Sequence, residues 1–100
     1  MAKVVAAPAV DRDIADIIEY LAREAGWPTA TKYLALFDDC FDRTGLYPKG
    51  GAPRPKLGRG VRISVVSPYI VVYRYEPQRD IVILLRILHG ARHITRKLVK

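Results

Sequence analysis

Residues 61–88 read VRISVVSPYIVVYRYEPQRDIVILLRIL, and this stretch decides the fold. It holds three runs rich in β-branched and aromatic residues, at 61–66, 69–75 and 81–88, which short turn segments separate. Such runs, broken by turn residues, are typical of β-strands joined by tight connections. The stretch therefore predicts a three-strand antiparallel meander. The last two runs are almost continuously apolar, which predicts central strands that other parts of the chain cover.

The chain before this stretch predicts two amphipathic helices. Apolar residues recur with a 3.6-residue period over residues 9–25 and again over 28–45. A proline suits the first turn of each helix, and Gly26 suits the end of the first. Because only two or three residues connect the helices, they must run antiparallel as a hairpin. A Val- and Ala-rich run at 3–7, closed by Pro8, predicts a short strand ahead of them.

Residues 46–60 contain seven Gly or Pro residues and predict a loop without a helix or strand. The glycines match neither a Walker spacing nor a dinucleotide fingerprint, so a nucleotide site is not predicted. Together the segments give an α+β fold in the order β-α-α-β-β-β. A two-helix hairpin packs on a mostly antiparallel sheet, and residues 1–100 form one domain.

Composition narrows the class of protein further. Cys40 is the only cysteine and lies on an apolar helix stripe, which excludes an internal disulfide and a cysteine metal cluster and predicts a buried thiol. No apolar run approaches the roughly 18 residues that a membrane span needs, and the N-terminus lacks a signal-peptide core. We therefore expect a cytoplasmic protein.

Charge is divided unevenly along the chain. Residues 1–44 hold eight acidic and five basic residues, whereas 45–100 hold two acidic and twelve basic ones. This asymmetry predicts that the C-terminal half meets an anionic partner: nucleic acid, a nucleoprotein machine or an acidic protein. A plain nucleic-acid-binding module is one hypothesis, but no zinc spacing or aromatic RNA-binding signature supports it. His89 and His93 are spaced for zinc on a helix, yet Gly90 between them favours a strand end.

One segment is specific enough to indicate a family. Residues 86–93, Arg-Ile-Leu-His-Gly-Ala-Arg-His, close the last strand, and Gly-Arg-Gly-Val-Arg at 58–62 opens the meander. Together with Tyr33, Leu-Tyr-Pro at 46–48 and the strand at 69–75, they resemble the ParE branch of the RelE/ParE toxin superfamily. The resemblance covers nearly the whole chain. It implies a small toxin, without cofactor or metal, that a ParD-like antitoxin holds inactive.

The two branches of this superfamily have different activities. RelE-like members cut mRNA on the ribosome, which needs proton-transfer groups and cations around the phosphate. If this chain were such a nuclease, Arg62, Arg86 and His89 would be its catalytic residues. ParE members instead poison DNA gyrase and are not nucleases. The tail has no tyrosine and Gly90 follows His89, so the residues favour the ParE branch and no enzymatic activity.

Two of these residues also have a structural interpretation. His89 at a strand end is typical of a histidine held by its neighbours rather than of a catalyst. Arg86 lies within an apolar strand, so it must extend to solvent or pair with an acid, and Glu76 or Asp80 are candidate partners.

The expected contacts fall into two sets. An acidic, amphipathic C-terminal segment of the antitoxin is expected to lie along the helical hairpin near Ile18, Tyr33 and Phe37. Contacts to the gyrase target are expected from basic or exposed residues of the second half, namely Arg59, Arg62, Arg86, His89, Arg92, Arg96 and Lys97. The predicted core comprises Ile14, Ile17, Leu21, Phe37, Phe41, Val61, Ile63, Val71, Tyr73, Ile83 and Leu85.

Overall fold

The computed structural model describes residues 1–99 and confirms the predicted α+β fold. Its elements are β1 (Lys3–Ala6), α1 (Pro8–Ala25), α2 (Trp27–Leu46), β2 (Ala52–Pro53), the 3-10 turn η1 (Pro55–Leu57), β3 (Val61–Val66), β4 (Tyr69–Glu76), β5 (Ile81–His89) and α3 (Arg96–Val99). The prediction of a loop without helix or strand at 46–60 is wrong in detail, because β2 and η1 lie within it. Pro53 is tolerated there because β2 is an edge strand that needs no donor on its outer side.

The five strands form one sheet in the order β1-β5-β4-β3-β2. β3, β4 and β5 are the predicted antiparallel meander, in which Arg62 lies opposite Tyr73 and Tyr69 opposite His89. β1 runs parallel to β5 from Lys3, opposite Ile81, as far as Ala6. Beyond that point, no strand within residues 1–99 pairs with this side of β5.

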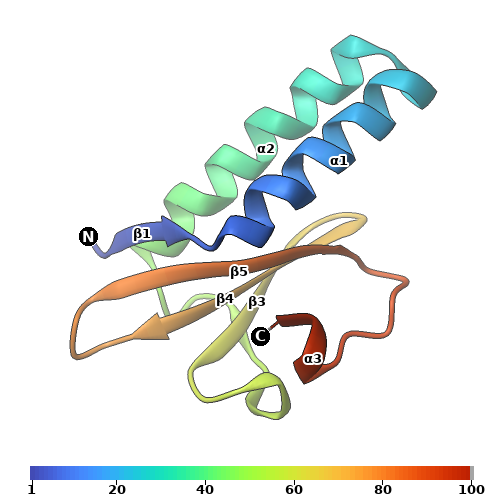
Figure 1. Ribbon diagram of the computed structural model, residues 1–100. Coiled ribbons are helices and arrows are strands. Elements are labelled where there is room, and N and C mark those ends of the chain that lie inside the picture. Colours follow the sequence, from blue (N-terminus) through green and yellow to red (C-terminus); the bar gives the residue numbers. More distant parts are fainter. Residues whose placement is uncertain (100) are drawn as a thin grey trace.

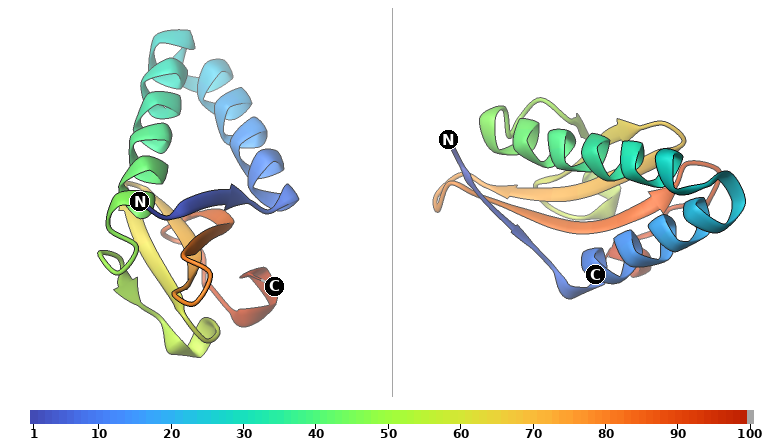
Figure 2. Two further views of the ribbon diagram at one scale, coloured as in Figure 1. Left: turned by 90° about the vertical axis from the view of Figure 1, so that its left-hand side faces the viewer. Right: turned by 90° about the horizontal axis from the view of Figure 1, so that it is seen from above.

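The helical hairpin covers one face of the sheet. Figure 1 shows α1 and α2 side by side above the strands, and Figure 2 shows them converging toward their connection at Gly26. Gly26 has a φ of 90°, a conformation that suits glycine. Buried residues on this side include Val10, Phe37, Cys40, Tyr73, Val82 and Leu84, and Ile14, Ile17, Leu21 and Phe41 pack against them.

The opposite face has a smaller core with a thinner cover. Its buried residues are Val61, Val72, Leu85, Leu88 and Val99, with Ile63 and Ile83 packed against them. Figure 1 shows α3 on this side, across the sheet from the hairpin, and α3 and η1 each contact the strands. Burial therefore confirms the predicted core, which is divided between the two faces of the sheet.

Candidate interaction sites

Arg86 lies at the unpaired edge of β5, just beyond the point where β1 ends. Its Nε donates to Oδ2 of Asp13 at 2.7 Å and its Nη2 donates to Oδ1 at 3.0 Å. The same Oδ2 accepts a hydrogen bond from the backbone N–H of Ile87, so Asp13 also satisfies a backbone donor at the open edge of β5. Nη1 of Arg86 donates to the carbonyl of Leu98, which links α1, β5 and α3. The hydrogen bond to Asp13 raises the pKa of Arg86.

This arrangement corrects two expectations about Arg86. The side chain is only 22 % exposed and each of its three nitrogens donates a hydrogen bond, so it is not among the exposed basic residues. Its partner is Asp13 and neither Glu76 nor Asp80, because the edge left open by β1 faces the first turns of α1. Glu76 pairs with Arg79, and Asp80 accepts a hydrogen bond from Tyr75.

The three residues assigned to a nuclease site do not converge. Arg62 donates to the carbonyls of Lys49 and Gly51, at 3.0 and 2.8 Å, whereas Arg86 is bound to Asp13. Arg62 lies opposite Tyr73, which pairs with Leu84, five residues before His89 on β5. At about 3.3 Å per residue, this separation is about 16 Å along the strand. A single phosphate cannot contact all three groups in this arrangement.

A basic cleft lies where loop 49–60 meets the turn between β4 and β5. Five cationic side chains line this cleft of about 790 Å³, together with Tyr75: Lys49, Arg59, Arg62, Arg74 and Arg79. Arg59 and Arg62 are two of the predicted target contacts. Sequence analysis missed Arg74, Tyr75 and Arg79, because they reach this cleft from the end of β4 and the turn after it, once β4 has paired with β3.

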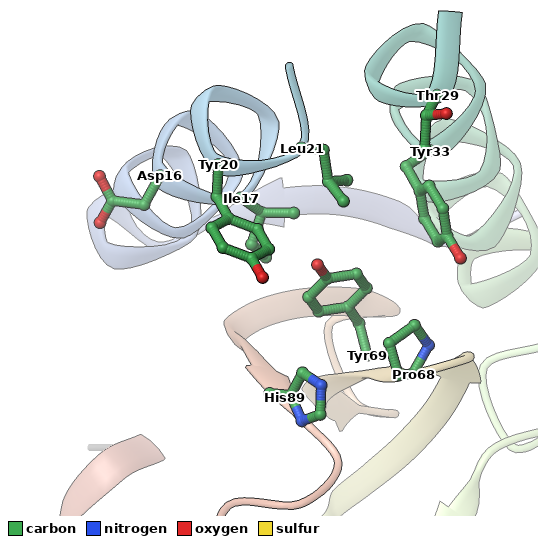
Figure 3. A pocket seen from close by; sticks show the side chains of 9 residues that line it. All are labelled: Asp16, Ile17, Tyr20, Leu21, Thr29, Tyr33, Pro68, Tyr69 and His89. Atoms are coloured by element: carbon green, nitrogen blue, oxygen red, sulfur yellow. The ribbon is translucent and has the colours of Figure 1, made fainter. Parts of the chain in front are cut away.

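A tyrosine pocket of about 520 Å³ lies at the other end of these strands (Figure 3). Tyr20 of α1, Tyr33 of α2, Tyr69 of β4 and His89 of β5 all line it. The Tyr33 hydroxyl donates to the carbonyl of Ser67 at 3.2 Å, and Nδ1 of His89 accepts the N–H of Ala91. Burial, and then the nearby Tyr33 and Tyr20, raise the pKa of Tyr69. His89 is therefore held by its neighbours, far from the basic cleft.

A third concave surface, the hairpin groove, separates α1 from α2. It has a volume of about 610 Å³, and its apolar lining includes Ile14, Ile18, Ala22, Trp27 and Leu34. Trp27 is 68 % exposed, which is unusual for a tryptophan. Ile18 thus lies in this groove, whereas Tyr33 lies in the tyrosine pocket.

Phe37 differs from the other two predicted antitoxin contacts. Its side chain is 0 % exposed and stacks against Phe41 and edge-on against Tyr69. The prediction that a partner reaches Phe37 is therefore wrong for the folded chain, because α2 directs this side chain into the core beneath the hairpin.

The remaining predicted target contacts lie in the C-terminal tail. Arg92, Arg96 and Lys97 are exposed, and the N–H of Arg92 donates to the carbonyl of His89. Val99 is buried against the second core and anchors this tail. In residues 1–99, no group of His, Cys, Asp and Glu side chains is placed to hold a metal ion. No helix within the described part of the chain is long and apolar enough to cross a membrane.

Comparison with solved structures shows which known proteins share this fold. The structure is similar to the chromosomal ParDE toxin–antitoxin system from P. aeruginosa, with a TM-score of 0.74, 20 % identity, and coverage of 89 % of this chain and 96 % of that one. It is also similar to the toxin–antitoxin complex RelBE2 from Mycobacterium tuberculosis, with a TM-score of 0.63 and 20 % identity over 88 % of this chain and 96 % of that one. The chain therefore shares its fold with these two structures.

Sequence comparison identifies the branch. Residues 4–94 match the family described as the ParE toxin of the type II toxin–antitoxin system parDE. Toxin ParE3 of Caulobacter vibrioides is 28 % identical over 100 residues, which cover all of this chain and 98 % of that protein. The chain belongs to the ParE toxin family, as its sequence predicted.

Proposed function

We propose that this chain inhibits DNA gyrase by binding it and stabilising its cleaved-DNA state, and that a ParD-like antitoxin neutralises it. The proposed place of this interaction is the cytoplasm. The observation that carries this proposal is the dispersal of Arg62, Arg86 and His89 in a chain that belongs to the ParE family. An inhibitor needs an accessible, charged surface, and the basic cleft and the tail offer one.

A ribosome-dependent nuclease, the alternative function, is poorly supported by this geometry. General acid–base catalysis needs proton-transfer groups within about 3 Å of the reacting atoms or one water away. His89 is in the tyrosine pocket, about 16 Å along the strands from the position of Arg62, and the Arg86 guanidinium is occupied by Asp13 and Leu98. Each missing acid or base typically costs about 10²–10⁴-fold in rate, so such a nuclease would be slow.

The hairpin groove is the proposed docking site for the antitoxin. Ile18, Trp27 and Leu34 present apolar surface between two helices, the kind of groove in which an amphipathic helix lays its apolar face. Exposed tryptophan is frequent among residues that dominate binding energy at interfaces. Acidic residues of the same antitoxin segment would reach the basic second half of the chain.

The antitoxin site can be tested with two aromatic residues of matched exposure. Trp27 is 68 % exposed in the groove, and Tyr47 is 69 % exposed beyond the end of α2. We expect Trp27→Ala to weaken antitoxin binding by at least about 30-fold, as for an interface hot spot worth about 2 kcal/mol. Tyr47→Ala should change the affinity by less than 3-fold. Equal losses in the two variants, measured by calorimetry, would contradict this docking site.

The proposed target can be tested with two purified systems. Supercoiling by gyrase, measured with and without the toxin, should be blocked and linear DNA should accumulate. Primer extension on ribosome-bound mRNA should show no new cuts at the same toxin concentration. Codon-positioned mRNA cuts with unaffected supercoiling would overturn the proposal and return Arg62, Arg86 and His89 to a catalytic role.

A further inference from the structure

We infer that the basic cleft binds the phosphodiester backbone of DNA, with an unpaired base against Tyr75. This inference rests on the proposed function, to which it adds that the toxin contacts the cleaved DNA as well as the gyrase protein. Its starting point is the set of charges that meet in the cleft without being neutralised there.

Most of the positive charge in the cleft has no internal partner. Arg79 is paired with Glu76 at 3.2 Å. Within residues 1–99, no ion pair forms at the side chains of Lys49, Arg59 or Arg74. Lining an open concavity with uncompensated cations costs electrostatic repulsion, which a bound polyanion would relieve. Clustered Lys and Arg side chains are the electrostatic footprint of nucleic-acid binding, to which the release of counterions from the phosphates adds affinity.

The cleft is held in shape by its backbone, in addition to carrying charge. Two carbonyls, of Lys49 and Gly51, fix the guanidinium of Arg62. Arg59 lies between Gly58 and Gly60, which have φ values of 142° and 74°. A Cβ at Gly60 would lie 2.8 Å from the carbonyl oxygen of Tyr75, so the loop passes this strand more closely than a side chain permits. The backbone therefore holds Arg59 beside the cleft.

Tyr75 favours nucleic acid over an acidic peptide as the occupant. Its hydroxyl donates to Oδ1 of Asp80 at 2.7 Å, and its half-buried side chain packs against the hairpin-side core and also lines the cleft. An aromatic ring within a positively charged groove is the arrangement on which unpaired bases stack, while the cations follow the backbone. The carboxylates of a peptide would use the cations but would have no need of the ring. Unpaired nucleotides at a strand break offer both groups.

The cleft also lies apart from the proposed antitoxin site. Its residues come from loop 49–60, the start of β3, the end of β4 and the β4–β5 turn, whereas the hairpin groove is made only of α1 and α2. An antitoxin helix in the groove therefore does not itself cover the cleft, which the acidic residues of the same segment would reach along the sheet.

Fluorescence anisotropy with the purified full chain tests the inference without gyrase. The probes are a labelled 12-nucleotide single strand, a duplex with a four-nucleotide overhang, and a blunt duplex, each in 50 to 200 mM salt. Arg59→Gln with Arg74→Gln should weaken binding to the single strand and the overhang at least tenfold. For the single strand, the slope of log affinity against log salt concentration should become shallower by about 1.4, because two fewer phosphates are neutralised. Tyr75→Leu should weaken binding to those two probes and leave the blunt duplex unchanged.

A matched control separates a site from general positive charge. Arg12→Gln with Lys32→Gln removes the same two charges from exposed positions on the helices. We expect this double variant to bind all three probes within twofold of the original chain. Equal weakening in both double variants would overturn the inference, as would a 12-residue polyglutamate peptide that binds the cleft more tightly than the single strand.

Supercoiling assays distinguish this inference from the proposed function. Inhibition of gyrase by the original chain tests the proposed function alone. If the original chain inhibits gyrase, the Arg59→Gln, Arg74→Gln variant should need at least a fivefold higher concentration. Unchanged inhibition by a variant that has lost DNA affinity would overturn the DNA contact and leave the proposed function standing.

Discussion

The two faces of the sheet are covered very differently. On one face, helices of 18 and 20 residues bury Phe37, Val71 and Val82 completely. On the other, a three-residue turn and the four-residue α3 cover a smaller core that includes Leu85 and Val99. The face covered by the hairpin, the thick side, therefore supplies most of the buried apolar area, and the face covered by η1 and α3 is the thin side. The thin side leaves its loops and tail accessible, and most of the predicted target contacts lie in these segments.

Charge follows the same division. The half of the chain that forms the hairpin is acidic, whereas the half that forms most of the sheet, the loops and the tail carries twelve of the seventeen basic residues. The ion pair between Asp13 and Arg86 crosses this boundary and extends to α3 through the carbonyl of Leu98. The comparison thus separates an acidic hairpin, which covers the larger core, from a basic sheet and tail, and the ion pair between Asp13 and Arg86 joins the two regions.

The largest effect is expected from truncation on the thick side. Phe37→Ala should lower the free energy of unfolding by about 3–5 kcal/mol, because the side chain is fully buried and the cavity cannot close between two helices and a sheet. Denaturant unfolding measures this value. Leu36→Ala, at a 37 % exposed neighbour on the same helix, should lower it by less than about 1 kcal/mol. A similar loss in both variants would contradict the idea that burial beneath the hairpin dominates the stability of the fold.

The ion pair that joins the regions should give the next largest effect. Asp13→Asn leaves the Arg86 guanidinium partly buried without its anion. The cost should be about 2–3 kcal/mol, below the range for fully buried pairs because the two side chains are 22 % and 13 % exposed. The control Glu19→Gln breaks an exposed pair with Arg23 and should change stability by less than about 0.5 kcal/mol.

Hydrogen exchange would sharpen this second test. Because Arg86 also holds the Leu98 carbonyl, Asp13→Asn should reduce amide protection in α3 as well as at Ile87. Protection lost only near α1 would show that the pair does not join the two regions.

Sequence analysis could identify features that depend on residues close together in the chain, and it missed contacts between residues that are far apart. The hairpin and the meander are encoded by local periodicity and turn residues, so they were predictable from the chain alone. Asp13 and Arg86 lie 73 positions apart, and their pairing depends on β1 ending early on β5. No local pattern carries that information, which is why nearer acids were considered as partners.

The same reasoning explains the outcome at the sites. Arg59 and Arg62 could be identified because they are basic and lie together at 58–62, where the meander begins, whereas Arg74 reaches the same cleft only through the pairing of β3 with β4. Phe37 was assigned both to the core and to a partner surface, since helical periodicity gives the apolar stripe without its depth. The structure resolves this ambiguity in favour of the core.

A smaller effect is expected where the thick side meets the loop that leads to the cleft. The Tyr73 hydroxyl donates to the carbonyl of Pro48 and accepts the N–H of Gly51, both at 2.9 Å. Tyr73→Phe leaves these two groups without a partner and should cost about 1–2 kcal/mol. Thermal unfolding measures the loss. No change would show that the loop is positioned by other contacts.

Tyr73 also predicts a dependence on pH. Burial raises its pKa above the usual 10.0, so the folded state keeps a proton that the unfolded chain releases. Its contribution to stability is fully present below pH 10 and is lost as the pH rises through the folded pKa. The original chain should therefore lose stability above pH 10 more steeply than Tyr73→Phe, although Tyr69 and Tyr75 contribute to the decline in both.

The smallest effect on stability, and a clear one on function, is expected at Arg92. Its side chain is exposed, and the hydrogen bond to His89 uses its backbone N–H, which alanine retains. Arg92→Ala should therefore change the free energy of unfolding by no more than about 0.5 kcal/mol. If Arg92 contacts the target as proposed, Arg92→Ala should raise the toxin concentration needed to block supercoiling by at least about fivefold, the loss typical of an interface arginine worth about 1 kcal/mol. Arg12→Ala, an exposed arginine on α1, should change neither quantity. A destabilised Arg92→Ala would mean that the tail helps to hold the thin face together, and unchanged inhibition would remove the tail from the target surface.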